Sequence, residues 1–156
     1  MNAIHLYRLG NWFYKKKIPF FPKLIRNFIF LIFNSYIPPS AQIGKGSVFA
    51  YGSIGVVLHS HSTIGSACVI GQGITIGAAE GYFSSDEHAA PKIGDNCYIS
   101  CGARIIGDIS VGSHSIVGAG AIVLEDVPEH SIVVGVPARV IGKTADNYLA
   151  IITDKK

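Results

Sequence analysis

The sequence predicts an all-β solenoid, a parallel β-helix in which short strands wind around one shared core. Aliphatic residues recur every six positions without a slip at Ile93, Ile99, Ile105, Val111, Val117 and Val123. Strands repeat every second residue and α-helices about every 3.6 residues, so a strict period of six is typical of neither alone. It indicates stacked coils with short flat sides, in which every sixth residue points inward.

Two further observations support this fold. The same spacing continues upstream in two shorter sets, which are Ile37, Ile43 and Phe49, and then Leu58, Ile64, Ile70 and Ile76. A glycine usually follows the aliphatic residue, and a small residue usually lies four positions after it. Glycine permits the tight corners of a narrow prism. Three hexads make one coil, so residues 37–128 predict roughly five coils.

Residues 1–36 form a basic, aromatic segment ahead of the solenoid. The segment carries Arg8, Lys15, Lys16, Lys17, Lys23 and Arg26 and no acid, since every Asp and Glu lies at or beyond Glu80. Helices are predicted over 3–17 and 23–36, separated by two prolines within 18–22. These helices either pack on the end of the prism or on neighbouring subunits, or they lie on an anionic membrane. The apolar run Phe28–Phe33 is far too short to span a bilayer, which takes about 20 residues.

The six-residue repeat is interrupted twice. Three extra residues follow Phe49, and residues 77–92 form a long loop that interrupts the repeat until Ile93. A polar loop extruded from a rigid solenoid is typical of a functional site. This loop carries groups that move protons, among them Asp86 and His88. Residues 129–156 are interpreted as a closing segment and tail.

Composition is consistent with one domain in a reducing compartment. The chain has 156 residues with 15% charged and 49% hydrophobic residues, as expected when short strands line a continuous core. Cys68 and Cys97 fall at the small inward position, and Cys101 falls near a corner. The three cysteines have no metal-type spacing, and no secretory signal is evident, so we expect a cytoplasmic protein. No nucleic-acid motif is found.

Two histidines are candidates for a general base. His59 takes the position after the aliphatic residue, where this chain normally has glycine, and lies beside the first interruption. His88 lies in the extruded loop. Imidazole titrates near neutral pH, so either side chain can accept a proton there. His61 is interpreted as a neighbour of the base, and His5, His114 and His130 as surface residues.

The repeat, the extruded loop and the ending from Val117 to Gly142, with its Gly-Val-Pro-Ala-Arg motif, resemble the hexapeptide-repeat acyltransferases. Within that superfamily the chain is similar to serine O-acetyltransferases and their relatives in surface-polysaccharide synthesis. Its opening residues, His-Leu-Tyr-Arg-Leu-Gly followed by Lys-Lys-Lys-Ile-Pro, look most like the short polysaccharide-type members. The resemblance covers about residues 36–143 and implies a left-handed β-helix.

The resemblance also implies a homotrimer with acetyl-CoA in a groove between adjacent prisms. By motif, Gly77 and Ala78 match the strand that meets the thioester end. Small residues that match the pantetheine arm are Ser100, Cys101, Gly102, Gly118 and Ala119. Arg139 and Lys143, in the closing segment, are expected to meet the nucleotide phosphates.

The chain departs from the serine acetyltransferases at the acceptor. Their Asp-His pair at the edge of the first coil aligns here with Ala50-Tyr51, and a further aspartate aligns with Tyr36. These missing acids argue against free serine. The sequence therefore predicts direct acetyl transfer from acetyl-CoA to a hydroxyl, less often an amine, of a sugar or surface-polysaccharide intermediate, in some cases lipid-linked. Expected acceptor-binding residues are Tyr51, His61 and Asp86.

Three alternatives remain open at this point. The first is a serine O-acetyltransferase. The second is a metalloenzyme like the γ-type carbonic anhydrases, which would need three histidines at subunit interfaces, although the ligand spacing is absent and no metal is expected. The third is a non-catalytic solenoid used for assembly or glycan binding.

Overall fold

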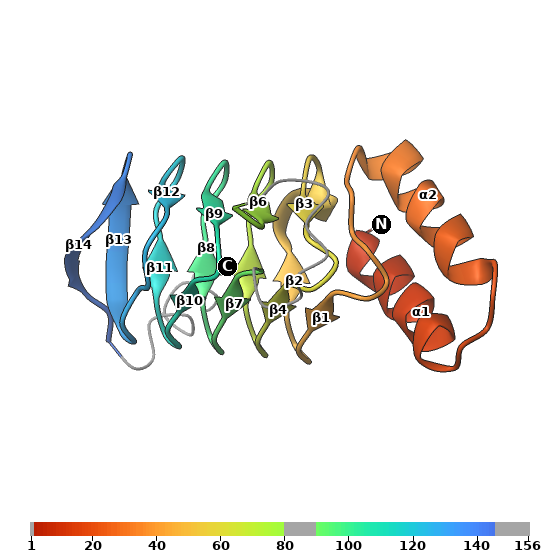
Figure 1. Ribbon diagram of the computed structural model, residues 1–156. Coiled ribbons are helices and arrows are strands. Elements are labelled where there is room, and N and C mark those ends of the chain that lie inside the picture. The colour runs from red at the N-terminus through yellow and green to blue at the C-terminus, as the bar shows by residue number, and fades with distance from the viewer. Residues whose placement is uncertain (1, 80–89, 146–156) are drawn as a thin grey trace.

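The computed structural model describes residues 2–79 and 90–145 of the chain. It shows a long prism of parallel strands with two helices at one end and a strand hairpin at the other (Figure 1). The predicted fold class, a left-handed parallel β-helix preceded by a short helical segment, is confirmed.

The prism has three sides, each a sheet of very short strands. The β1 sheet contains β1 (Gln42–Ile43), β4 (Thr63–Ile64), β7 (Lys92–Ile93) and β10 (Ser110–Val111). The β2 sheet contains β2 (Val48–Phe49), β5 (Val69–Ile70), β8 (Tyr98–Ile99), β11 (Ile116–Val117), β13 (Ser131–Gly135) and β14 (Ala138–Lys143). The β3 sheet contains β3 (Val57–Leu58), β6 (Thr75–Gly77), β9 (Arg104–Ile106) and β12 (Ile122–Val123).

Each side of the prism carries five parallel levels. The β2 sheet supplies them with β2, β5, β8, β11 and β13, and β14 then pairs antiparallel with β13. Isolated parallel bridges add a fifth level to the other two sides, Tyr36 beside Val57 and Val127 beside Val111. The predicted five coils are therefore confirmed.

The core consists of the residues that the repeat predicts to point inward. The large inward position is buried at every hexad, with Ile76, Ile99, Ile105 and Val117 fully inaccessible. The small inward position is equally closed at Cys68, Cys97 and Ala103. Both cysteines are free thiols packed in the core, as expected from their place in the repeat.

The outward position after each aliphatic residue differs between the sides. On the β1 sheet it is always glycine, and a Cβ on Gly65 would lie 2.6 Å from the backbone carbon of Gly94 in the next coil. On the β3 sheet it is filled by His59, Gly77, Ile106 and Leu124. A Cβ on Gly77 would meet nothing closer than Ile106 Cδ1, at 3.5 Å. His59 thus stands where this chain normally has glycine, but on a side of the prism that has room for a side chain at this position.

Two helices precede the prism, as predicted, but their boundaries differ from the prediction. Helix α1 spans Ala3–Lys15 and helix α2 spans Phe21–Phe33. Helix α2 begins two residues earlier than predicted because Pro22 lies in its first turn, where the missing N–H of proline costs no hydrogen bond. It ends at Asn34, which adopts the left-handed conformation with φ 50°. Neither described helix is long and apolar enough to cross a bilayer.

Helix α1 covers the open end of the first coil. The Tyr7 hydroxyl donates to the Ala41 carbonyl at 2.5 Å, and the Asn11 amide donates to the Pro39 carbonyl at 2.7 Å. The Arg8 guanidinium donates to the Ile43 and Gly44 carbonyls. An open sheet edge would leave such carbonyls without partners and free to pair with other chains. The packing of the helical segment on the end of the prism, one of the predicted alternatives, is confirmed.

The first interruption of the repeat is a short 3-10 turn, η1 (Ala50–Ser53), in which Tyr51 and Gly52 have positive φ. The second contains residues 80–89, which lie outside the described part of the chain. The division into segments 1–36, 37–128 and 129–156 stays a prediction.

Candidate active site

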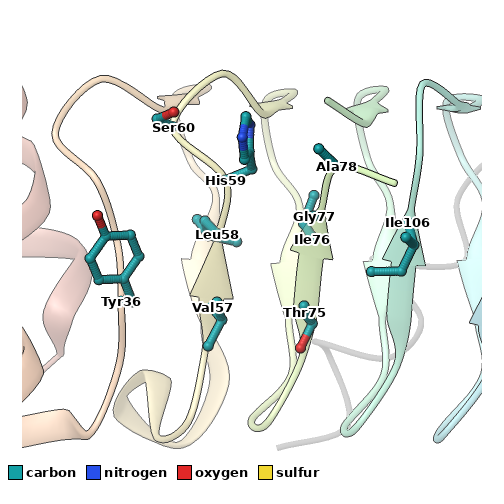
Figure 2. A pocket seen from close by; sticks show the side chains of 10 residues that line it. All are labelled: Tyr36, Val57, Leu58, His59, Ser60, Thr75, Ile76, Gly77, Ala78 and Ile106. Atoms are coloured by element: carbon teal, nitrogen blue, oxygen red, sulfur yellow. The ribbon is translucent and has the colours of Figure 1, made fainter. Parts of the chain in front are cut away.

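A groove of about 590 Å³ lies on the outer surface of the β3 sheet, at its N-terminal end. Figure 2 shows the side chains that line it, from Tyr36 beside the helices, across β3 and β6, to Ile106 on β9. The groove lies on the side of the prism where no outward corner glycine packs against the backbone of the next coil. His59, Gly77 and Ala78, which the sequence places apart, line the same groove.

His59 is held at the groove by its own backbone. Its N–H donates to the Ile76 carbonyl of the next coil at 2.8 Å. Its carbonyl accepts from the Ser62 N–H at 3.1 Å and from the Ser62 hydroxyl at 2.7 Å. These bonds fix the Cα of His59 beside β6, while the imidazole remains on the groove side of the strand (Figure 2).

The pKa of His59 is lowered from its usual value of 6.5. The larger cause is burial of the ring, which disfavours the charged imidazolium, and the smaller cause is the nearby His61, whose ring centroid lies 5.6 Å away. His59 is therefore mostly neutral at pH 7, and a neutral imidazole has a lone pair that can accept a proton.

One ring nitrogen of His59 already has a hydrogen-bond partner. The His61 N–H donates to Nδ1 at 3.3 Å, near the long limit for such a bond. In this arrangement the neutral ring carries its proton on Nε2. To accept a proton through Nε2, the ring must instead carry its proton on Nδ1, and the bond from the His61 N–H is then lost. Because that bond is long, its loss costs little free energy.

Gly77 and Ala78 form the floor of the groove next to His59. The Gly77 carbonyl accepts from the Gly107 N–H at 2.9 Å, so this stretch is fixed to β9. The Ala78 N–H donates to no acceptor among residues 2–79 and 90–145. A backbone N–H without an internal acceptor, beside a base, is able to stabilise a developing oxyanion. The sequence analysis matched both residues to the thioester end of the donor, and that assignment stays a prediction.

The other predicted cofactor residues lie elsewhere on the same chain. Ser100, Cys101 and Gly102 follow β8, and Gly118 and Ala119 follow β11, so both groups lie at the corner between the β2 and β3 sheets. They border the β3 sheet at the edge opposite to His59 and do not line the groove.

Arg139 and Lys143 lie on β14, at the far end of the prism from the groove (Figure 1). Both are exposed, and Arg139 lies 3.8 Å from the Glu125 carboxylate. Within one chain they are not brought together with His59.

The predicted acceptor residues are scattered. Tyr51 is 70% exposed in η1 and does not line the groove. His61 is exposed and lies beside His59 without lining the groove. Asp86 and His88 lie outside the described residues. Of the two candidate bases, His59 is the one whose surroundings are described.

Several groove residues were not proposed as site residues from the sequence, among them Tyr36, Ser60 and Ile106. Ile106 carries a signal in hindsight, because it follows Ile105 at a position where glycine is expected, as His59 follows Leu58. The large side chains at this position, His59, Ile106 and Leu124, all lie on the β3 side of the prism, where Gly77 is the exception. Tyr36 carries a signal too, because it precedes Ile37 of the repeat and aligns with an acceptor-site aspartate of the serine acetyltransferases, and it lies beside Val57 in the structure.

Within the described parts of the chain, no three His, Cys, Asp or Glu side chains converge as a metal ion requires. The histidines that the metalloenzyme alternative needs are separated: His59 and His61 lie at the groove, while His114 stacks on His130 with ring centroids 4.7 Å apart.

Comparison with known proteins gives a consistent family. Residues 90–125 match the family model described as bacterial transferase hexapeptide (six repeats). The chain is 35% identical to the serine acetyltransferase of Synechococcus elongatus, over 90% of this chain and 56% of that protein. It is 37% identical to the serine acetyltransferase of Bacillus pumilus, over 90% of this chain and 63% of that protein.

Among solved structures, the chain resembles the serine acetyltransferase of Brucella abortus in complex with coenzyme A. The TM-score is 0.84 at 35% identity, covering 92% of this chain and 56% of that one. The chain thus spans between half and two thirds of the length of these relatives. They are serine acetyltransferases, which the sequence analysis had ranked behind the polysaccharide-type members.

Proposed function

Because the chain belongs to the hexapeptide-repeat transferases, we propose that it transfers an acetyl group from acetyl-CoA to the hydroxyl of a small acceptor. The observation that carries this proposal is the groove on the β3 sheet. There, His59, with a pKa below that of free histidine, shares one surface with the floor formed by Gly77 and Ala78.

The reaction is a direct transfer. His59 takes the proton of the acceptor hydroxyl as its oxygen attacks the thioester carbonyl, and a C–O bond forms. The Ala78 N–H donates to the oxyanion of the tetrahedral intermediate. The C–S bond then breaks, and the leaving sulfur takes the proton back from His59, so protons and electron pairs balance. Cys101 is not needed as a nucleophile, since no acyl-enzyme is formed.

The donor is proposed to lie along the β3 side of the prism. Gly77 leaves room for a slender pantetheine arm, since its nearest neighbour is the flexible end of Ile106. At the opposite edge, Gly102 and Gly120 both have positive φ, and a Cβ on Gly120 would meet nothing within 4 Å. That corner is therefore open enough for a chain of methylene and amide groups to lie against backbone.

We further propose a homotrimer with the donor between adjacent prisms. The basis is the resemblance to the hexapeptide-repeat transferases. Arg139 and Lys143 lie on β14, far along the prism from the groove (Figure 1), where only the phosphate end of an elongated donor would meet them. In a trimer, cationic side chains of one subunit are able to meet the phosphates of a donor bound against the next.

For the acceptor, the relatives favour free serine, because the proteins with which the chain shares 35–37% identity are serine acetyltransferases. One observation favours a second candidate, the hydroxyl of a sugar. No described residue that lines the groove is acidic, so the ammonium group of serine has no carboxylate partner there. A neutral sugar hydroxyl needs none.

The test is a thiol-release assay with acetyl-CoA against serine, nucleotide sugars and amino sugars. Release with serine alone assigns the first acceptor, and release with a sugar alone assigns the second. If neither acceptor releases thiol and calorimetry detects no coenzyme A binding, the transferase proposal is wrong and a non-catalytic solenoid takes its place.

A further inference from the structure

Helix α2 has two apolar faces, and only one of them is used inside the molecule. Pro22, Ile29 and Phe33 are buried on the inner face, next to α1 and the first coil. The other face is exposed and carries a stripe of large apolar side chains, which we call the outer stripe: Phe21, Leu24, Phe28, Leu31 and Ile32. Their spacing of three and four residues places them on one side of the helix, and Leu31 is 78% exposed.

The outer stripe continues into an aromatic cluster at the turn between the two helices. Phe21 stacks on Phe13 with ring centroids 5.0 Å apart, and Phe13 in turn meets the edge of Trp12 at 5.0 Å. Phe20 lies 6.0 Å from Phe21 and is 70% exposed. Ten of the eighteen exposed large hydrophobic side chains in the described residues fall within 1–36, so exposed apolar surface is concentrated at this end.

The same end is strongly cationic. Residues 1–36 carry six Lys and Arg residues and no acid. Arg8 is used in bonds to the first coil, and Arg26 lies over the Tyr36 ring with its guanidinium carbon 5.5 Å from the centroid. The other four are lysines near the aromatic cluster: Lys15, Lys16, Lys17 and Lys23. Three of these, Lys15, Lys17 and Lys23, line one hollow of about 570 Å³ together with Phe20.

We propose that this end of the molecule docks on an anionic membrane surface, with α2 lying in the plane of the interface. Apolar and aromatic side chains beside lysines are the combination that inserts into the boundary between headgroups and acyl chains. The lysines that line the hollow meet lipid phosphates, and the outer stripe enters the acyl layer. Since α1 is bonded to the first coil and packs on α2, docking of α2 also holds the prism at the surface.

The charge decides between a membrane and a second copy of the chain. Pairing of two outer stripes in a symmetric contact would bring two clusters of lysines together, and residues 1–36 contain no acid to offset them. An anionic surface supplies the opposite charge, with each lysine near it strengthening binding by roughly fivefold.

The experiment is sedimentation of the full chain with phosphatidylcholine vesicles, with and without added phosphatidylglycerol. We expect binding to the anionic vesicles, weaker binding at high salt, and little binding to phosphatidylcholine alone. Lys15→Gln/Lys16→Gln/Lys17→Gln should lower the affinity by about a hundredfold at low salt. Phe28→Glu/Leu31→Glu, on the outer stripe, should abolish detectable sedimentation.

The matched control is Leu124→Glu/Ile141→Glu, which changes the net charge by the same amount at exposed apolar side chains away from the helices. It should bind as the wild type does, and far-UV circular dichroism should show that both double variants are folded. The absence of binding to anionic vesicles at low salt overturns the proposal. An equal loss of vesicle binding in the stripe variant and the control variant also overturns the proposal. A wild type of larger size in solution than the folded stripe variant, by light scattering, assigns the stripe to contacts between copies instead. Since the readout is binding, it does not depend on the proposed acetyl transfer.

Discussion

The β1 and β3 sheets are built from the same six-residue repeat, but different residues occupy the outward corner position that follows the buried aliphatic residue. On the β1 sheet, Gly44, Gly65, Gly94 and Gly112 let each coil press its backbone onto the next. On the β3 sheet, the same position carries His59, Gly77, Ile106 and Leu124, and the coils leave space at that corner. The aliphatic residue before it is buried on both sides. Folding therefore restricts the choice of residue at the inward positions on every side, but at the outward corner only where backbones touch. On the β3 side the corner residues are free to serve chemistry.

The comparison is tested most strongly at His59. The variant His59→Gln should lower kcat by about 100- to 10,000-fold at saturating acetyl-CoA, because a general base contributes on this scale. Thermal unfolding should change little, since the backbone bonds of His59 remain. His61→Gln is the control and should retain activity within about an order of magnitude, as expected for a neighbour rather than the base. A loss under about tenfold for His59→Gln would show that the base lies elsewhere, with His88 the next candidate.

Glycine-to-alanine changes compare the two corners directly. Gly65→Ala should destabilise the fold by about 1–3 kcal/mol, because its Cβ would lie 2.6 Å from the backbone carbon of Gly94. A backbone atom cannot move aside as the end of a flexible side chain can. The midpoint of thermal unfolding should fall by about 2–12 °C. Gly77→Ala should leave the midpoint almost unchanged, since its Cβ meets only the end of Ile106 at 3.5 Å. Equal destabilisation by both variants would remove the distinction between the corners.

The pH dependence of kcat tests whether the pKa of His59, at the β3 corner, is lowered as described. A base must be unprotonated, so activity should fall as the pH drops through the pKa of His59, which lies below 6.5 because of burial and of His61. Removing the imidazole in His61→Asn removes a charge that opposes protonation of His59. The pKa of His59 then rises, and the acid limb of the profile should move to higher pH. A limb that moves to lower pH, or does not move, contradicts this coupling.

The smallest effect is expected at Ile106, which borders the groove without taking part in the chemistry. Ile106→Ala should raise KM for acetyl-CoA by roughly three- to tenfold, through lost apolar contact, with kcat nearly unchanged. Leu124→Ala occupies the equivalent position outside the groove and serves as its control. If the two variants behave alike in steady-state kinetics, the donor does not lie against Ile106.

The six-residue repeat was sufficient to predict the prism. Large aliphatic residues such as Ile99 and small residues such as Cys97 recur every six positions, and they mark the side chains that point inward. The groove was only partly predictable. His59, Gly77 and Ala78 were named from spacing and resemblance, whereas Tyr36 was not named as a groove residue, although it precedes Ile37 of the repeat and so lies beside Val57. The open β3 corner was also missed, because a one-dimensional count of glycines does not state which side of the prism each one faces.

The acceptor was the least predictable feature. The sequence analysis favoured a sugar because Ala50, Tyr51 and Tyr36 replace the expected acids, whereas the relatives are serine acetyltransferases. Residue identities at aligned positions do not show which side chains another subunit would bring to the groove in the proposed trimer. Specificity for a charged acceptor depends on that complete set of neighbours.

The two ends of the prism are closed by different devices, side-chain donors from α1 at one and the antiparallel strand β14 at the other. Neither device contacts the middle coils, which meet only their immediate neighbours. The number of coils can therefore change in this architecture without a change in either end. Gene duplication could insert or remove a whole coil between the two closures without changing either. The length of the molecule would then change while the first three coils, with most of the groove, keep their arrangement.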